Sequence, residues 1–119
     1  RYVPPSPEKV PQLIEDLISW WVKLYPKLIA SNDKNEILNA IVKFHSDFLT
    51  IHPFLDGNGR LARFLLMQQA NELLKIDRSI VLEDKAPYFD ALLEAQKDNI
   101  EPLRVIITQA LYGEEKIDG

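Results

Sequence analysis

The fold is decided by residues 52–63, which read His52-Pro53-Phe54-Leu55-Asp56-Gly57-Asn58-Gly59-Arg60-Leu61-Ala62-Arg63. Pro53 stops a helix that arrives from upstream, because the residue before a proline avoids helical backbone angles. Two glycines then form a short turn, and apolar residues resume at helical spacing directly after it. The stretch therefore predicts two helices joined by a tight loop, with the second helix starting at Arg60.

Apolar residues recur at helical spacing on both sides of this loop. Upstream, we expect one helix from Pro11 that Pro26 ends or kinks, and a second that follows the polar, cap-forming residues 31–35. Downstream of the loop helix, two further helices follow Pro87 and Pro102. The apolar positions behind the five helices are Leu13, Ile14, Leu17, Ile18, Trp21, Leu24 and Leu28; Ile37, Leu38, Ile41, Val42, His45, Phe48 and Leu49; Leu61, Phe64, Leu65 and Leu73 or Leu74; Tyr88, Leu92, Leu93 and Ala95; and Leu103, Ile106, Ile107, Ala110 and Leu111.

These helices predict an all-α fold class, a compact helical bundle with the loop between its two central helices. No stretch alternates convincingly as a strand, and residues 80–82 form an apolar triplet that is too short to classify. We expect residues 1–10 to be an extended, proline-rich lead-in, residues 11–112 the core domain, and residues 113–119 a polar tail that frays. Because the chain starts with Arg rather than Met, we expect a fragment of a longer protein.

Composition narrows the possible functions. With 119 residues, of which 46% are hydrophobic, the chain can build one ordinary core. Fourteen Lys and Arg against eighteen Asp and Glu give a net charge of −4, so we expect no direct nucleic-acid contact by this segment. The chain has no cysteine and two histidines, which excludes thiol chemistry and leaves metal binding to carboxylates. No stretch reaches the ~20 apolar residues of a membrane helix, and no basic segment precedes an apolar one, which predicts a cytoplasmic protein.

The loop has the chemistry of an anion site. The first amides of a helix have no internal partner, and the helix dipole favours negative charge beside them. Gly57 and Gly59 allow an anion to approach the backbone closely. Arg60 and Arg63 are three residues apart and share nearly one face of the new helix. Since arginine pairs with phosphate oxygens through two nitrogens, the arrangement indicates a polyphosphate site.

Two further side chains stand next to this anion site. His52 is a ready general base near neutral pH, and Asp56 is the kind of oxygen ligand that holds Mg²⁺ together with phosphate oxygens. Together they indicate phosphoryl or nucleotidyl transfer, without a Walker or kinase glycine motif. Structural alternatives remain: His52 can cap a helix, Asp56 can form a turn before glycine, and the arginines can be solvated surface cations.

The twelve-residue run resembles the signature of the Fic family, H-P-F-x-[D/E]-G-N-G-R-x-x-R, and matches it at every specified position. The resemblance continues upstream, in Val3-Pro4-Pro5 and in His45 and Phe48 of the preceding helix. It covers most of the chain, about residues 3–111.

This resemblance implies a protein adenylyltransferase that moves AMP from ATP to a Tyr, Thr or Ser hydroxyl of a target protein and releases pyrophosphate. It implies that His52 is the general base that deprotonates the hydroxyl, and that Asp56 holds Mg²⁺ between the α- and β-phosphates. The remaining implied roles are an anion nest made by Asn58 with the amides of Gly57, Gly59 and Arg60, a β-phosphate contact from Arg60, a γ-phosphate contact from Arg63, and a core anchor for the loop from Phe54.

Two features bear on the subtype. The related Doc branch, which is kinase-like, carries a lysine at the position of Gly59, so its chemistry is disfavoured here. Many Fic proteins are inhibited by a helix with the pattern [ST]-x-x-x-E-[GN], whose glutamate pairs with the second arginine of the signature. Residues 79–83 have the spacing, but Asp84 follows. We therefore expect any inhibitory helix or antitoxin, and the β-hairpin flap that docks the target, to lie outside this chain.

Other functions stay open at this point. The same site could remove AMP from a modified protein or transfer from another nucleotide such as UTP, or the chain could be a nucleotide-binding regulatory module without turnover. Outside the loop, we expect His45 to be a buried, hydrogen-bonded structural histidine and Asp84 to lie on a solvated face. The aromatic residues expected to serve as core and rim packing are Trp20, Trp21, Phe44, Phe48 and Phe64.

Overall fold

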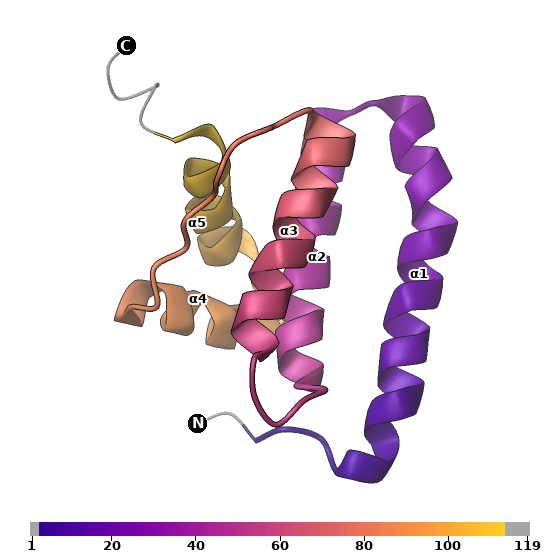
Figure 1. Cartoon of the computed structure of the whole chain (residues 1–119), viewed down its shortest axis with the longest axis vertical. Coiled ribbons are helices and arrows are strands. Elements are labelled where there is room, and N and C mark those ends of the chain that lie inside the picture. Colours follow the sequence, from indigo (N-terminus) through magenta and orange to yellow (C-terminus); the bar gives the residue numbers. More distant parts are fainter. Residues whose placement is uncertain (1–2, 114–119) are drawn as a thin grey trace.

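The computed structural model describes residues 3–113, and this part of the chain contains five α-helices (Figure 1). A short 3₁₀ helix at Pro7–Lys9 is followed by α1 (Val10–Ser31), α2 (Lys34–Ile51), α3 (Asn58–Leu74), α4 (Ala86–Gln96) and α5 (Glu101–Tyr112). No residue in the range 3–113 belongs to a strand, so the predicted all-α class is confirmed. Within that range, no helix is both long and apolar enough to cross a membrane. The predicted tail lies outside the described residues, except for Gly113.

The lead-in and α1 differ from the prediction. The lead-in is not extended throughout, because it contains the 3₁₀ helix, and α1 starts at Val10. The helix continues through Pro26 to Ser31, so the expectation that Pro26 ends it is wrong. An interior proline removes one helical hydrogen bond and costs about 3 kcal/mol. The helix persists because Leu28, beyond the proline, is 2% exposed and packs into the main core, and Asn32 in the left-handed conformation ends it.

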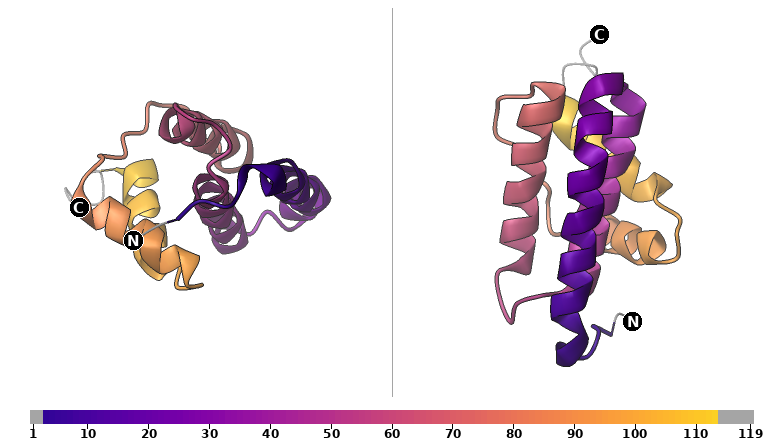
Figure 2. Two further views of the ribbon diagram at one scale, coloured as in Figure 1. Left: turned by 90° about the horizontal axis from the view of Figure 1, so that it is seen from below. Right: turned by 90° about the vertical axis from the view of Figure 1, so that its right-hand side faces the viewer.

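α2 is the central helix of the bundle. It contacts α1, α3, α4 and α5, and ten of its eighteen residues are buried. Figure 2 shows α1 on one side of it and α4 and α5 on the other. Asp33 caps its start by accepting hydrogen bonds from the backbone N–H groups of Asn35 and Glu36 at 2.9 and 3.2 Å. Because α2 ends immediately before His52 and Pro53, the core fixes the point at which the loop begins.

α3 starts at Asn58, two residues before the predicted start, and turns a different face to the core. Ala62, Leu66 and Ala70 are buried, whereas Phe64 is 54% exposed, so the predicted place of Phe64 on the buried side is wrong. The two alanines leave room between α3 and the core for little more than one leucine, and a phenylalanine ring would not fit there. Of the other predicted positions, Leu73 is buried and Leu61, Leu65 and Leu74 are half-buried.

The connection from α3 to α4 runs back along the bundle without regular structure (Figure 1). In the unclassified triplet, Ile80 and Leu82 are buried and Val81 is exposed, which is the alternation of an extended segment. This path returns the chain to the first turns of α3, where Asp84 contacts Arg63. The connection therefore brings α4 to the loop predicted to carry the chemistry.

Candidate active site

The candidate site begins where α2 ends. His52 is the C-terminal cap residue of α2, with φ 55° and ψ 61°, and its backbone N–H donates to the carbonyl of Phe48 at 3.1 Å. The left-handed backbone turns the chain away from the helix, and the His52 side chain is exposed. The imidazole is thus accessible to a group that arrives from solvent, as a general base for an incoming hydroxyl must be.

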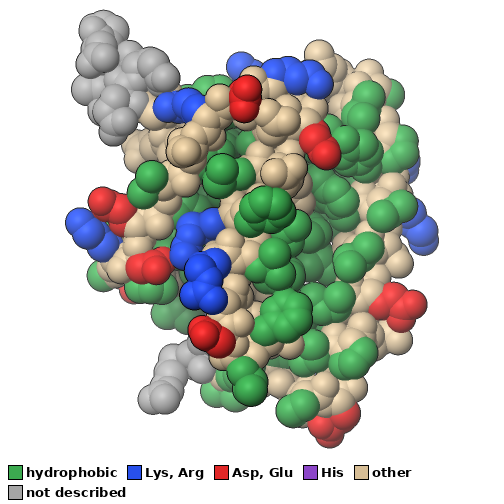
Figure 3. Space-filling view, viewed as in Figure 1, with side chains coloured by type: hydrophobic (Ala, Val, Ile, Leu, Met, Phe, Trp, Pro, Cys, Tyr) green, Lys and Arg blue, Asp and Glu red, His purple; other side chains and the backbone are tan. Residues whose placement is uncertain are grey.

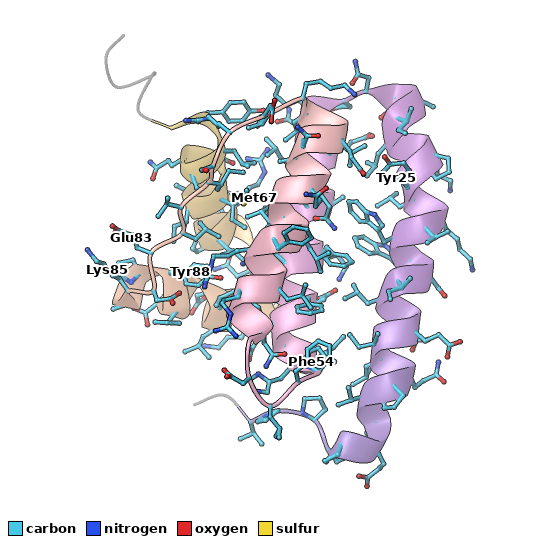
Figure 4. The ribbon with its side chains drawn as sticks, viewed as in Figure 1. Tyr25, Phe54, Met67, Glu83, Lys85 and Tyr88 are labelled. Carbon is cyan, nitrogen blue, oxygen red and sulfur yellow. The ribbon has the colours of Figure 1, made fainter. Side chains whose placement is uncertain are left out.

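Asn58 ties the loop together. Its side chain is 5% exposed, accepts a hydrogen bond from the backbone N–H of Phe54 at 3.0 Å and donates to the carbonyl of Phe54 at 2.7 Å. The same amide nitrogen lies 3.4 Å from both ring nitrogens of His52. Phe54 itself is 52% exposed (Figure 4), so the expectation that its ring anchors the loop in the core is wrong. The anchored part of Phe54 is its backbone.

The start of α3 leaves its first amides without helical partners. The first bond of the helix runs from the N–H of Leu61 to the carbonyl of Gly57 at 3.0 Å. The N–H groups of the three residues between them, Asn58, Gly59 and Arg60, therefore have no acceptor within the helix. Gly57 has φ 83°, a conformation that residues with side chains rarely adopt. Free amides at a helix start attract an anion, as predicted for this loop.

Both arginines of the signature fold back over the glycines. A side-chain carbon added at Gly57 would lie 3.0 Å from Nη2 of Arg60, and one added at Gly59 would lie 3.4 Å from Nη1 of Arg63. The two guanidinium groups thus lie close to the loop backbone and its free amides. Basic side chains gather at this end of α3 (Figure 3). The positive potential of this acidic chain is therefore local to the loop.

Arg63 also has a partner from outside the loop. Its Nη1 atom forms an ion pair with Oδ1 of Asp84 at 3.1 Å, and the two side chains are 26% and 58% exposed. Asp84 is largely solvated, as predicted, but its pairing was not foreseen. Sequence spacing carries no signal of this pair, because the two residues are 21 positions apart and joined through an irregular connection.

A buried pair of rings lies behind Arg63. Nε2 of His45, from α2, is 2.7 Å from the hydroxyl of Tyr88, from α4, and the two residues are 1% and 4% exposed. The predicted buried, hydrogen-bonded role of His45 is confirmed. Burial lowers the pKa of His45 to about 4, against a hydrogen bond with the Ala62 backbone and together with the charge of Arg63. Burial likewise raises the pKa of Tyr88 to about 12, against the charge of Arg63. Both rings are therefore neutral at physiological pH.

The donor set of the loop limits how a metal ion could bind. Among residues 3–113, no three or more His, Asp or Glu side chains are grouped so that they could hold a metal ion. Asp56 is exposed, and its Oδ1 atom accepts a hydrogen bond from the Gly57 N–H at 2.8 Å. Mg²⁺ commonly takes one or two carboxylates together with substrate phosphate oxygens. The single carboxylate of Asp56 therefore fits Mg²⁺ that arrives with a phosphate ligand.

The fold brings all of the predicted site residues into one region, the loop and the first two turns of α3. These residues are His52, Asp56, Gly57, Asn58, Gly59, Arg60 and Arg63. Sequence reasoning missed the contacts that Asp84 and Tyr88 make with Arg63. Tyr88 was predicted only as an apolar position of its helix, which is the usual meaning of an aromatic residue at helical spacing.

Comparisons with known proteins agree with the predicted resemblance. Residues 1–70 match the family model described as Fic, the Fic/DOC family. The chain is 31% identical over 121 residues to "Probable protein adenylyltransferase aq_aa38" of Aquifex aeolicus (strain VF5), a match that covers 99% of this chain and 32% of the relative. It is 28% identical to protein adenylyltransferase fic-1 of Caenorhabditis elegans (86% of this chain, 19% of the relative) and 27% identical to protein adenylyltransferase Fic of Nematostella vectensis (85% and 22%). The chain thus spans between about a fifth and a third of the length of these relatives.

Proposed function

Since the chain belongs to the Fic/DOC family, we propose that it is the core of a protein adenylyltransferase, which transfers AMP from ATP to a Tyr, Thr or Ser hydroxyl of a target protein and releases pyrophosphate. One observation carries this proposal: three unpaired helix amides, two guanidinium groups and an accessible imidazole meet in one loop. The relatives that are named protein adenylyltransferases support it.

In this proposal the triphosphate of ATP lies against the start of α3. The free amides of residues 58–60 and the dipole of α3 favour its negative charge. Arg60 contacts the β-phosphate and Arg63, one helical turn further on, contacts the γ-phosphate, each through a planar fork that matches phosphate oxygens. The side chain of Asn58 is occupied by the Phe54 backbone, so Asn58 contributes to the anion nest through its own backbone N–H.

His52 acts as the general base. A ring nitrogen of the neutral imidazole takes the proton of the target hydroxyl, and the oxygen attacks the α-phosphorus of ATP. The bond from the α-phosphorus to the bridging oxygen breaks, and the electron pair leaves with pyrophosphate. The exposure of His52 supports this role, because the hydroxyl belongs to another protein and must reach the ring from outside.

Asp56 would hold Mg²⁺ between the α- and β-phosphates, where the ion would neutralise the charge that develops on the leaving pyrophosphate. The hydrogen bond that Asp56 accepts from Gly57 keeps its carboxylate on the loop. A cytoplasmic location and an inhibitory helix or antitoxin outside this chain stay predictions.

The test is incubation of the purified protein and a cell extract with ATP labelled at the α-phosphate. We expect protein-bound label that disappears with His52→Ala and with Asp56→Asn. Asp77→Asn serves as the matched control, because Asp77 is exposed in the α3–α4 connection, away from the loop. Equal labelling by the wild type and His52→Ala would overturn the role of His52.

The same assay separates the alternatives. ATP binding without pyrophosphate release, in every extract and with Mg²⁺ present, would identify a nucleotide-binding module and overturn the transferase proposal. Loss of label from a protein that already carries AMP would indicate the reverse reaction. Label transferred from UTP but not from ATP would change the nucleotide and leave the roles of the loop residues intact.

A further inference from the structure

The His45–Tyr88 pair is not used by the proposed reaction, although it lies against one of its arginines. Its two members come from α2 and α4, are almost fully buried and meet at 2.7 Å. The labels in Figure 4 place Tyr88 beside the first turns of α3. A buried hydroxyl in contact with a buried imidazole costs desolvation energy, so its partners need an explanation beyond filling space.

The directions of the hydrogen bonds point to Arg63. Tyr88 accepts a hydrogen bond from the Arg63 side chain. Its own proton is therefore free to be donated to Nε2 of His45, which is neutral and can accept it. The hydrogen bond with the Ala62 backbone raises the pKa of His45, so the backbone group is an acceptor, the carbonyl of Ala62. One chain of donors thus runs from Arg63 through Tyr88 to His45.

Tyr88 differs from Asp84 in what it does to the charge of Arg63. Asp84 is an anion, and its ion pair with Arg63 is in competition with any phosphate that approaches the same nitrogens. The Tyr88 hydroxyl is neutral, so it orients the guanidinium and leaves the full positive charge for a phosphate. Tyr88 is also 4% exposed, whereas Asp84 is more than half exposed, so only the tyrosine has a fixed position.

We propose that Tyr88, held by His45, is a positioning residue that fixes the Arg63 guanidinium for the terminal phosphate of a nucleoside triphosphate. The proposal rests on the proposed function, in which Arg63 contacts the γ-phosphate. It makes the packing of α4 on α2 a determinant of how well the site distinguishes a triphosphate from a diphosphate.

The first test is the affinity of the full chain for ATP and for ADP, each with Mg²⁺, by titration calorimetry. Tyr88→Phe keeps the ring and removes the hydroxyl, and we expect it to weaken ATP binding about tenfold and to leave ADP binding unchanged. Tyr25→Phe is the matched control, because the Tyr25 hydroxyl donates to Glu72 at 3.1 Å at the far end of α3 (Figure 4). An equal loss for both nucleotides with Tyr88→Phe would overturn the proposal, because a merely structural role weakens the whole site.

The second test follows Arg63 without a nucleotide. The side-chain Nε–H resonance of Arg63 in NMR spectra should be narrowly dispersed and broadened by motion in Tyr88→Phe and in His45→Gln, but not in Tyr25→Phe. An unchanged resonance in both variants would refute the positioning role. In the Arg63→Met background, Tyr88→Phe should have no further effect on ATP affinity, and an effect of full size there would also refute it. If Arg63→Met alone leaves ATP affinity unchanged, the phosphate contact of the proposed function is wrong, whatever the resonance shows.

Discussion

Replacing Asn58 by alanine tests whether the loop is held by one side chain. Asn58 makes two hydrogen bonds, both to the backbone of Phe54, and its side chain is buried at the joint between the loop and α3. The substitution removes both bonds and leaves the polar groups of Phe54 to compete for water. We therefore expect a less stable protein and a loop that no longer presents His52 and the helix amides together.

The magnitude follows from the contacts. A neutral hydrogen bond contributes about 0.5–1.5 kcal/mol net, so two bonds correspond to roughly 1–3 kcal/mol. Because Phe54 is half exposed and water can reach part of its backbone, we take a middle value of about 2 kcal/mol. For a domain of this size, 1 kcal/mol shifts the melting temperature by about 4 °C, which gives a decrease of about 8 °C.

The measurement is thermal unfolding by circular dichroism, with ATP affinity measured in parallel at a temperature where the variant is folded. Asn71→Ala is the control, since Asn71 lies on the same helix, is exposed and makes one longer bond, at 3.3 Å to the carbonyl of Ile76. We expect the control to shift the melting temperature by about 2 °C or less. If Asn58→Ala matches the control in melting temperature and keeps wild-type ATP affinity, the side chain does not hold the loop.

Three other variants and conditions have defined expectations. Leu66→Ala, at a position 1% exposed, should lower the free energy of unfolding in urea by about 3–5 kcal/mol, whereas Phe64→Ala should cost less than about 1 kcal/mol, and similar costs would contradict the observed face of α3. His45 has a folded pKa of about 4 against about 6.5 unfolded, so only the unfolded state gains a proton as pH falls through this window; stability should fall by up to about 3 kcal/mol between pH 6.5 and 4, and His45→Gln should lose this component of the pH dependence of the melting temperature. Asp84→Asn removes an exposed ion pair, so the melting temperature should change by no more than about 2 °C, while ATP binding measured by calorimetry should strengthen several-fold because Arg63 no longer has a competing anion; weaker binding would show that Asp84 supports the site.

The loop and the helices around it could be predicted because local rules decide them. Pro53 ends α2 by steric exclusion, and Gly57 supplies the left-handed backbone that starts α3. Helical spacing of apolar residues found α4 and α5 to within one residue of their predicted starts, because each begins beside a proline. The signature residues are contiguous, so the same local geometry places them together.

What could not be predicted depends on packing between distant segments. Phe64 and Phe54 are apolar at helical or loop positions, but the space beside Ala62 and the hydrogen bonds of Asn58 decide that neither ring enters the core. Pro26 is tolerated because residues beyond it bury apolar surface. The contact between Tyr88 and Arg63 arises only from the path of the α3–α4 connection, which has no periodicity to detect.

The left-handed backbone of His52 has a consequence for the energetics of turnover. A residue with a side chain in this conformation carries about 1–2 kcal/mol of strain, which the bond to Phe48 and the following proline maintain in the folded protein. The imidazole is thus oriented by the main chain, before any nucleotide or target is bound. The entropy lost in ordering the proposed base belongs to folding and does not recur in each catalytic cycle, which is preorganisation achieved by backbone geometry.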